Sequence, residues 1–248
     1  MGEIRSERDG AVAVVSLAAP DRRNALVPEM ARELVAACEE IDANTEIGAA
    51  VIRADGASFC AGAHRDVLAT CAADPTDEGN YAALDQIYQA FTRVGQLQVP
   101  VIAAVRGHAV GAGVNLVLAA DLRIVADTAQ IVPGFAGIGV HPGGGHFTLM
   151  NRLAGREATA ALSLFGEHIS GTDAARIGLA WAALPGDEVE PRCLELARRV
   201  ARRPALARSM TRSFRLSVGP PALSWQAALE TERASQLWSL RNSLDFGR

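Results

Sequence analysis

Residues 106–121 read RGHAVGAGVNLVLAAD and place a cluster of glycines between two apolar patterns. The run before the cluster, residues 99–105 (VPVIAAV), predicts a buried strand, and the apolar residues after it predict a helix. Gly107, Gly111 and Gly113 therefore fall after a strand and before a helix. Glycine lets a backbone approach a ligand closely, and the start of a helix presents unpaired N–H groups to a negatively charged oxygen. The stretch predicts a turn that can hold an oxyanion or a phosphate.

The same order of strand, loop and helix repeats on both sides of this stretch, which predicts an α/β architecture. The other predicted elements are a hairpin of residues 4–7 and 11–17 around an Asp-Gly turn, a helix from Pro28 to about residue 44, a buried strand over residues 49–53, a helix over residues 81–97 and a strand over residues 122–126.

The pattern changes after residue 186, where only helices are predicted. Their ranges are residues 189–203, 204–216 and 222–240. The last range carries Trp225, Leu229 and Trp238, more apolar surface than an isolated terminal helix can cover by itself. Packing on a neighbouring subunit and folding back on the chain's own core both remain open. We therefore divide the chain into a core of residues 1–186 and a C-terminal helical region of residues 187–248.

Composition excludes several classes of protein. A chain of 248 residues can bury a core without disulfides, and a net charge of −4 gives no electrostatic reason to expect nucleic acid. The four cysteines form no CxxC pair, and the N-terminus has no apolar signal core. The longest apolar stretch, residues 109–120, is too short to span a bilayer. We expect a cytoplasmic protein without a membrane or nucleic-acid partner.

Familiar glycine and serine motifs do not fit. A nucleotide P-loop needs Gly-Lys followed by Ser or Thr, and a dinucleotide fingerprint needs a third glycine where Leu116 stands. The chain also has no GxSxG nucleophile elbow. The glycine cluster is therefore not a nucleotide site of either kind, and serine-hydrolase chemistry has no support.

A second backbone segment could supply another N–H donor. Residues 58–66 read SFCAGAHRD, a segment that comes soon after the predicted strand over residues 49–53 and contains the small residues Ala61, Gly62 and Ala63. Two donors aimed at one point would polarise a carbonyl and stabilise an enolate. Taken singly, each segment could equally be a tight turn and nothing more.

Together these segments resemble a known family, the crotonase superfamily of enoyl-CoA hydratases and isomerases. The stretches that carry the resemblance, in order and spacing, are RRNAL at 22–26, FCAGAH at 59–64, GHAVGAGVNLVLAAD at 107–121 and AQIVPGFAGIGVHPGGG at 129–145. The resemblance covers nearly the whole chain. It implies a spiral of ββα units, a homotrimer or dimer of trimers built through the C-terminal helices, and an acyl-CoA thioester of fatty acid metabolism as substrate. Coenzyme A would arrive as part of that substrate, with no permanently bound cofactor and no metal.

The resemblance also assigns binding roles. The oxyanion-hole N–H groups would be those of Ala63 and Ala112. The contacts to coenzyme A would come from Arg22, Arg23 and Ala25 near the phosphates and adenine, and from Ala61, Ala63 and His64 near the pantetheine and base. Two arginines in succession suit phosphate pairing, although they could also be solvated surface charges.

This chain differs from the resembled family at the positions of the catalytic acids. The two hydratase glutamates fall on Asn115 and Phe135, neither of which titrates near neutrality. Some relatives carry an aspartate instead, at the position of Gly143. The same loop holds His141, which we take as the candidate acid/base, with the alternative that it simply bonds a backbone carbonyl. No carboxylate in the loop would join His141 and His146 at a metal.

Three functions remain open from the sequence. The first is an enoyl-CoA hydratase or isomerase with rearranged acid/base groups. The second is a different acyl-CoA reaction on the same enolate scaffold, such as that of a hydrolase or lyase, and the third is an acyl-CoA-binding protein without turnover. Retention of both oxyanion segments favours an enzyme, whereas loss of the usual acids favours a binder. The fold alone does not decide among them.

Overall fold

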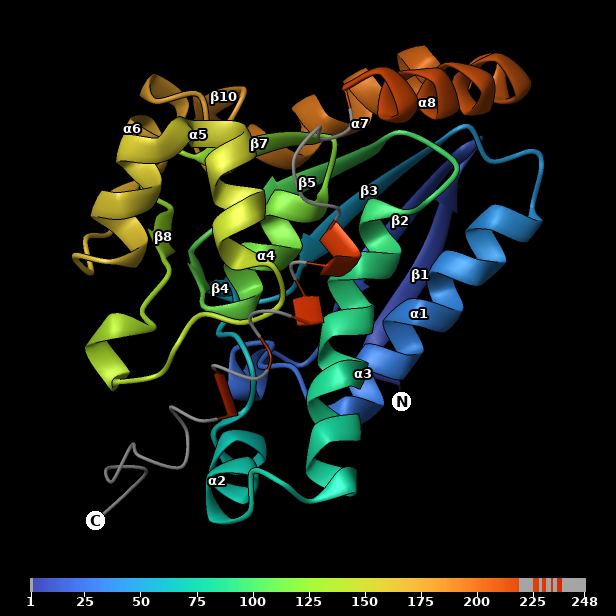
Figure 1. Ribbon diagram of the computed structural model, residues 1–248. Coiled ribbons are helices and arrows are strands. Elements are labelled where there is room, and N and C mark those ends of the chain that lie inside the picture. Colours follow the sequence, from blue (N-terminus) through green and yellow to red (C-terminus); the bar gives the residue numbers. More distant parts are fainter. Residues whose placement is uncertain (1, 219–224, 228, 231–232, 234–235, 238–248) are drawn as a thin grey trace.

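The structure is a computed structural model that describes residues 2–218, 225–227, 229–230, 233 and 236–237. Its strands form two sheets (Figure 1). The larger sheet has the order β1 (Ile4–Asp9), β2 (Val12–Leu17), β3 (Ala49–Ala54), β5 (Val101–Val105), β7 (Leu122–Ala126) and β10 (Ala182–Leu184). The smaller sheet has the order β4 (Ser58–Cys60), β6 (His108–Val110), β8 (Gln130–Val132) and β9 (Ile169–Ser170).

Three successive strand pairs give the fold its repeat. In β3–β4, β5–β6 and β7–β8 the first strand joins the larger sheet and the second joins the smaller one, always beside the strand of the preceding unit. Helices complete these units: α2 (Arg65–Ala73) and α3 (Glu78–Gly95) follow β4, α4 (Ala112–Ala119) follows β6 and α5 (His146–Ser163) follows β8. The ββα repeat implied by the resemblance is confirmed. Because the second strands are parallel neighbours, the loops after them meet at one edge of the smaller sheet.

Helices enclose the larger sheet (Figure 1). Strands β2 and β5 are buried along their whole length, as expected where both faces of a sheet are covered. Helix α7 (Val189–Ala201) packs against β2, β3, β5 and β7, while α1 (Pro28–Ala43) packs against α3 and β1. Short helix α6 (Gly171–Arg176) lies between β9 and β10. The predicted hairpin, the helix that begins at Pro28 and the three predicted parallel strands are all confirmed.

The C-terminal residues pack on their own chain. Leu229 is buried in the main core, and the ring of Trp225 stacks on Phe91 with centroids 6.4 Å apart. Trp225 Nε1 also donates to the carbonyl of Gly144 over 3.3 Å. Of the two alternatives for this helix, folding back is therefore the one observed for Trp225 and Leu229. Trp238 lies outside the described residues.

Exposed apolar surface lies elsewhere, on α8 (Pro204–Val218). Leu206, Met210 and Phe214 are spaced four residues apart on this helix, and each is about half exposed. Val189 of α7, which lies just after the division at residue 186, belongs to the same core as the sheet strands. None of the helices in the described ranges has the length and apolar character needed to cross a bilayer.

Candidate functional site

A cavity of about 770 Å³ lies where the loops after β4, β6 and β8 come together. It is mostly apolar, and the glycine-rich segments singled out in the sequence form much of its wall. The face of α3 and one residue of the C-terminal segment complete it. The cavity is lined by residues 61–63, 65, 68, 84, 87–88, 110–112, 115, 132–135, 137–140, 143 and 236.

Close backbone packing joins the two predicted donor segments. Strands β4 and β6 are parallel neighbours, so the chain leaves both at the same edge. Gly62 has φ +87°, and a Cβ there would lie 2.7 Å from the Val110 carbonyl oxygen and 3.4 Å from the Ala112 nitrogen. Any side chain at position 62 would therefore push the segments apart, so glycine is required for the approach.

Ala63 and Ala112 both line the cavity. On one side of Ala63, the Leu26 amide donates to the Gly62 carbonyl over 2.7 Å and the His64 amide donates to the Leu26 carbonyl over 2.8 Å. This parallel bridge turns the Ala63 N–H away from Leu26. Ala112 is the first residue of α4, where an amide has no partner within the helix. Neither amide donates a hydrogen bond within the described part of the chain, so both can receive a ligand oxygen.

Asn115 lines the cavity, and its side chain forms hydrogen bonds to two other parts of the chain. Its Nδ2 donates to the Gly143 carbonyl over 2.9 Å, and its Oδ1 lies 2.8 Å from Nδ1 of His146. Nε2 of His146 in turn lies 2.9 Å from the Ser163 hydroxyl. Because the amide NH₂ must face the Gly143 carbonyl, Nδ1 of His146 carries the proton and Nε2 accepts from Ser163. Asn115 therefore ties the loop at Gly143 to His146 of α5.

His146 is held neutral inside this network. The side chain is fully buried, and burial lowers the pKa of His146 to about 4. Removal of the imidazolium from water is the cause, since burial penalises the charged form. His146 lies beside Phe135, with ring centroids 5.0 Å apart. Phe135 itself lies in the cavity close to Gly111 and makes that wall apolar.

His141 does not belong to the cavity lining. Its Nδ1 lies 2.7 Å from the Pro142 carbonyl oxygen, and its ring meets the edge of Phe147 at a centroid distance of 5.9 Å. This position favours the alternative stated from the sequence, in which His141 bonds a backbone carbonyl. The acid/base role of His141 stays a prediction that its surroundings do not favour.

The two arginines expected near coenzyme A differ in whether their side chains are already paired within the protein. Arg22 forms a two-pronged ion pair with Glu3 and also donates to the Ala25 carbonyl over 2.9 Å. The pKa of Glu3 is lowered chiefly by this hydrogen bond from Arg22. Arg23 is exposed, and its carbonyl accepts from the Ala61 amide over 3.0 Å. Only Arg23 therefore has a guanidinium that faces solvent, while Ala25 is buried.

His64 caps a helix instead of lining the cavity. Its Nδ1 accepts from the Asp66 amide over 3.3 Å at the start of α2. The neighbouring Arg65 lines the cavity, as do Ala61 and Ala63. Sequence reasoning missed Arg65 because the resemblance assigned coenzyme A contacts only up to His64.

Three more residues at or near the site were not predicted. Buried Asn24 accepts from the Ala19 amide and donates to the carbonyls of Asp55 and Ser58, which fixes the RRNAL loop beside β4. Tyr88 of α3 and Gln236 of the C-terminal segment line the cavity next to Gly143. Asn24 could have been suspected as an amide inside an otherwise apolar motif. Tyr88 could not, because it occupies an apolar-face position of α3.

Polar side chains are few in this cavity. Among the described residues that line it, those with polar side chains are Arg65, Tyr88, Asn115 and Gln236, and none is a carboxylate, imidazole or thiol. The same part of the chain also contains no cluster of three or more His, Cys, Asp or Glu side chains that could hold a metal ion. The arrangement can polarise an oxygen through backbone amides, but it has few groups that exchange protons.

Comparison with known proteins identifies relatives. The family profile described as "Enoyl-CoA hydratase/isomerase" matches residues 7–242. The probable enoyl-CoA hydratase EchA14 of Mycobacterium tuberculosis is 38% identical over 189 residues, which is 76% of this chain and 72% of the relative. The 1,2-epoxyphenylacetyl-CoA isomerase of Escherichia coli is 29% identical over 234 residues, covering 92% and 87% of the two chains.

The fold has close counterparts among solved structures. The enoyl-CoA hydratase of Bacillus halodurans superposes with a TM-score of 0.88, covering 97% of this chain and 96% of the other at 23% identity. At that identity the likeness concerns the fold, and it agrees with the ββα repeat described above.

Proposed function

Because the chain belongs to the enoyl-CoA hydratase/isomerase family, we propose that it binds an acyl-CoA thioester in this cavity and stabilises the thioester enolate through the N–H groups of Ala63 and Ala112. Chemistry would then occur by proton transfer at the carbon next to the carbonyl. Rapid addition of water is not expected, because Asn115 and Phe135 occupy the positions of the hydratase glutamates. The chain acts as an acyl-CoA enzyme of this family.

One observation carries the proposal. The amides of Ala63 and Ala112 lie in the wall of one cavity, on segments in backbone contact, and neither donates to another described residue. Preorganised backbone donors of this kind lower the free energy of a developing oxyanion, and a single donor is worth roughly 100- to 1,000-fold in kcat. The relatives named as hydratases and as an epoxyphenylacetyl-CoA isomerase support an acyl-CoA substrate and turnover.

The contacts to coenzyme A are part of this proposal. Ala61 and Ala63 offer backbone groups at the cavity, and exposed Arg23 and Arg65 offer charges to phosphate oxygens. Arg22 and His64 would contribute less, since Arg22 is paired with Glu3 and His64 caps α2. We also propose a homotrimer or dimer of trimers, as the family resemblance implies.

Ala112→Pro provides a direct test of the donor. Proline is tolerated at the first position of a helix, so the change removes the N–H while α4 can still form. Gly111 before it has φ 53° and ψ −117°, outside the helical region that a following proline disfavours. We expect kcat with an acyl-CoA substrate to fall by roughly 100-fold or more. Ala112→Gly keeps the amide and serves as the matched control.

The outcomes separate a donor role from a packing role. Equal activity of Ala112→Pro and Ala112→Gly, with both folded by circular dichroism, would overturn the assignment of the Ala112 amide. Failure of the native protein to bind any of a panel of acyl-CoA thioesters would overturn the proposed function as a whole.

A further inference from the structure

We propose that Tyr88 is the catalytic residue that carries the proton in this cavity, serving a 1,3-proton shift on an unsaturated acyl thioester. The inference rests on the proposed function and adds the missing acid/base group to it. Tyr88 lies on α3, a helix that packs on α1, and its side chain is buried and lines the cavity. Neither the sequence pattern nor the resemblance assigns it a role.

Position is the first argument. A Cβ built on Gly143 would overlap both the Tyr88 hydroxyl and Oε1 of Gln236. Position 143 is where some relatives of the resembled family carry an aspartate. The phenol therefore occupies the space in which a side chain at position 143 would lie, and it brings a proton-exchanging group to that place from another element.

Contacts connect this hydroxyl to the proposed enolate. Gly143, which Tyr88 touches, accepts a hydrogen bond of 2.9 Å from Asn115. Asn115 lies one helical turn after Ala112 on α4. Tyr88 and Ala112 both line the same cavity, and Asn115 connects the loop at Gly143 to the helix that begins at Ala112.

Elimination is the second argument. Among the described polar side chains that line the cavity, the Asn115 and Gln236 amides do not titrate, and arginine does not give up its proton in proteins. Tyrosine is one of the side chains that transfer protons in enzymes. An isomerisation needs one group that removes a proton and returns it, whereas hydration needs groups for both water and carbon. A cavity whose described lining offers one proton-exchanging side chain therefore suits isomerisation.

The step balances without an added reagent. The Tyr88 phenol first releases its proton to solvent. The phenolate then removes a proton from carbon 2 of a 3-enoyl thioester, and the C–H electron pair moves toward the carbonyl oxygen, which the Ala63 and Ala112 amides stabilise. The dienolate takes the same proton back from the phenol at carbon 4, the carbonyl re-forms, and the double bond lies between carbons 2 and 3. Tyr88 ends as the phenolate that began the step.

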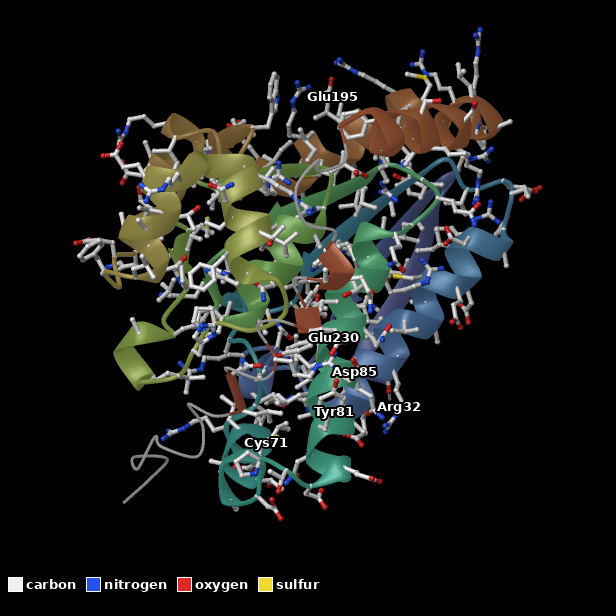
Figure 2. All side chains as sticks on the ribbon, viewed as in Figure 1. Arg32, Cys71, Tyr81, Asp85, Glu195 and Glu230 are labelled. Atoms are coloured by element: carbon white, nitrogen blue, oxygen red, sulfur yellow. The ribbon has the colours of Figure 1, made fainter. Side chains whose placement is uncertain are left out.

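The position of Tyr88 is fixed by its neighbours. Its ring packs on Phe91 with centroids 5.9 Å apart, and the Arg233 guanidinium lies 5.4 Å from its centre. Arg233 also lies over Tyr81 at 4.3 Å and pairs with Asp85 over 2.5 Å. Tyr81 and Asp85 of α3 are labelled in Figure 2, and the Tyr81 hydroxyl donates to Oε2 of Glu230, a residue of the C-terminal segment, over 3.1 Å.

The experiment compares Tyr88→Phe with Tyr81→Phe in the full chain. The two changes are chemically identical, but Tyr81 is partly exposed and does not line the cavity. The assay follows conversion of 3-hexenoyl-CoA to the conjugated 2-enoyl thioester by absorbance, and deuterium uptake at carbon 2 of butyryl-CoA in heavy water. We expect Tyr88→Phe to lose at least 100-fold in both rates while its Kd for butyryl-CoA changes less than about threefold. Tyr81→Phe should keep both rates.

A second measurement covers the case in which Tyr88→Phe does not fold. The chain has two tyrosines, so growth of Tyr81→Phe on fluorotyrosine labels Tyr88 alone with a more acidic phenol. We expect the pH–rate profile for isomerisation to move to lower pH. A merely structural tyrosine would leave that profile in place.

Each result has a distinct meaning. Rates of Tyr88→Phe within tenfold of the native protein, or an unmoved pH profile in the fluorotyrosine protein, would overturn the role of Tyr88 and leave the proposed function standing. Native protein that binds butyryl-CoA without isomerisation or deuterium uptake would also overturn it. Native protein that binds no acyl-CoA would instead overturn the proposed function.

Discussion

At the scale of single residues, buried His146 ties the stability of the fold to pH. The folded protein holds His146 neutral with a pKa of about 4, compared with 6.5 for a free imidazole. At a pH between these two pKa values, His146 is protonated in the unfolded chain and neutral in the folded chain. The contribution of neutral His146 to the free energy of unfolding is therefore fully present above pH 6.5, the pKa in the unfolded chain, and is lost as pH falls toward 4.

We therefore predict a specific loss of stability in mild acid. From pH 7 to pH 5, His146 should lower the free energy of unfolding by about 2 kcal/mol, as an order of magnitude. His146→Asn keeps an N–H donor for Asn115 but does not titrate, so its denaturant midpoint should fall less over the same interval. Identical pH dependence in the two proteins would contradict the neutral, buried assignment.

Asn115 and Phe135 lead to a second residue-level prediction, on hydration. The Asn115 amide does not titrate and Phe135 presents a ring, so neither side chain can take a proton from water. General acid–base catalysis contributes roughly 100- to 10,000-fold, and the native protein should therefore hydrate crotonyl-CoA very slowly. The rate is measured from the loss of enoyl thioester absorbance.

Restoring the acids supplies the comparison for this prediction. Asn115→Glu combined with Phe135→Glu should raise hydration, at some cost in stability because the His146 network is broken. A native rate on the order of 10 per second or more would contradict the loss of the acids. In that event His141→Ala is the next variant to measure, since abolished activity would restore the role first expected of His141.

Site residues that act through the backbone could be predicted from the sequence, whereas site residues that act through the side chain could not. Ala63 and Ala112 were predictable as cavity residues because glycines beside them define the turns. Tyr88 was not, since its spacing with Leu84, Ile87 and Phe91 is that of any core residue on a helix. His141 was chosen by residue type, and only the structure shows that its ring turns to Pro142 and Phe147.

At the scale of elements, the strands of the larger sheet other than β10 were predicted, and those of the smaller sheet were not. Strands β3, β5 and β7 have five or six residues that are apolar except for Arg53 and Arg123. Strands β4, β6 and β8 have three residues each, too few for a periodic pattern. They nevertheless place the site, because their parallel pairing brings the loops that follow them to one cavity.

Helix α8 gives the prediction at this scale. The apolar surface first assigned to Trp225 and Leu229 is covered within the chain, but Leu206, Met210 and Phe214 form an exposed stripe. We predict that this stripe is buried between subunits, because exposed apolar residues in a row mark interaction surfaces. Light scattering should give an oligomeric mass for the native protein, and Met210→Glu with Phe214→Glu should give a monomer.

A matched control tests whether the stripe is responsible. Arg212 lies on the same helix and is exposed. Arg212→Glu should leave the mass unchanged, because Arg212 is not part of the apolar row. A native protein that is monomeric at micromolar concentration would contradict the prediction. The C-terminal region would then stabilise only its own chain.

At the scale of the whole molecule, the cavity joins parts of the chain that are far apart in sequence. Its lining extends from Ala61 to Gln236. Trp225 stacks on Phe91 of α3 and Leu229 is buried in the main core, so the C-terminal segment packs on its own chain. The sequence predicted these helices but not their return to the site, because an apolar helix face looks the same whether it covers its own core or a neighbour's. Ligand binding should therefore stabilise the entire fold.

We predict that this stabilisation is specific to thioesters of coenzyme A. Acetyl-CoA offers a carbonyl to the Ala63 and Ala112 amides and phosphates to Arg23 and Arg65, whereas acetate offers neither the nucleotide nor the thioester. Calorimetry should show acetyl-CoA binding well above coenzyme A, with acetate undetectable. At a ligand concentration of 100 times Kd, the free energy of unfolding should rise by about 2.7 kcal/mol. Equal affinity for acetyl-CoA and coenzyme A would show that the thioester carbonyl adds nothing to the affinity. That result would contradict the proposal that the Ala63 and Ala112 amides bind this carbonyl.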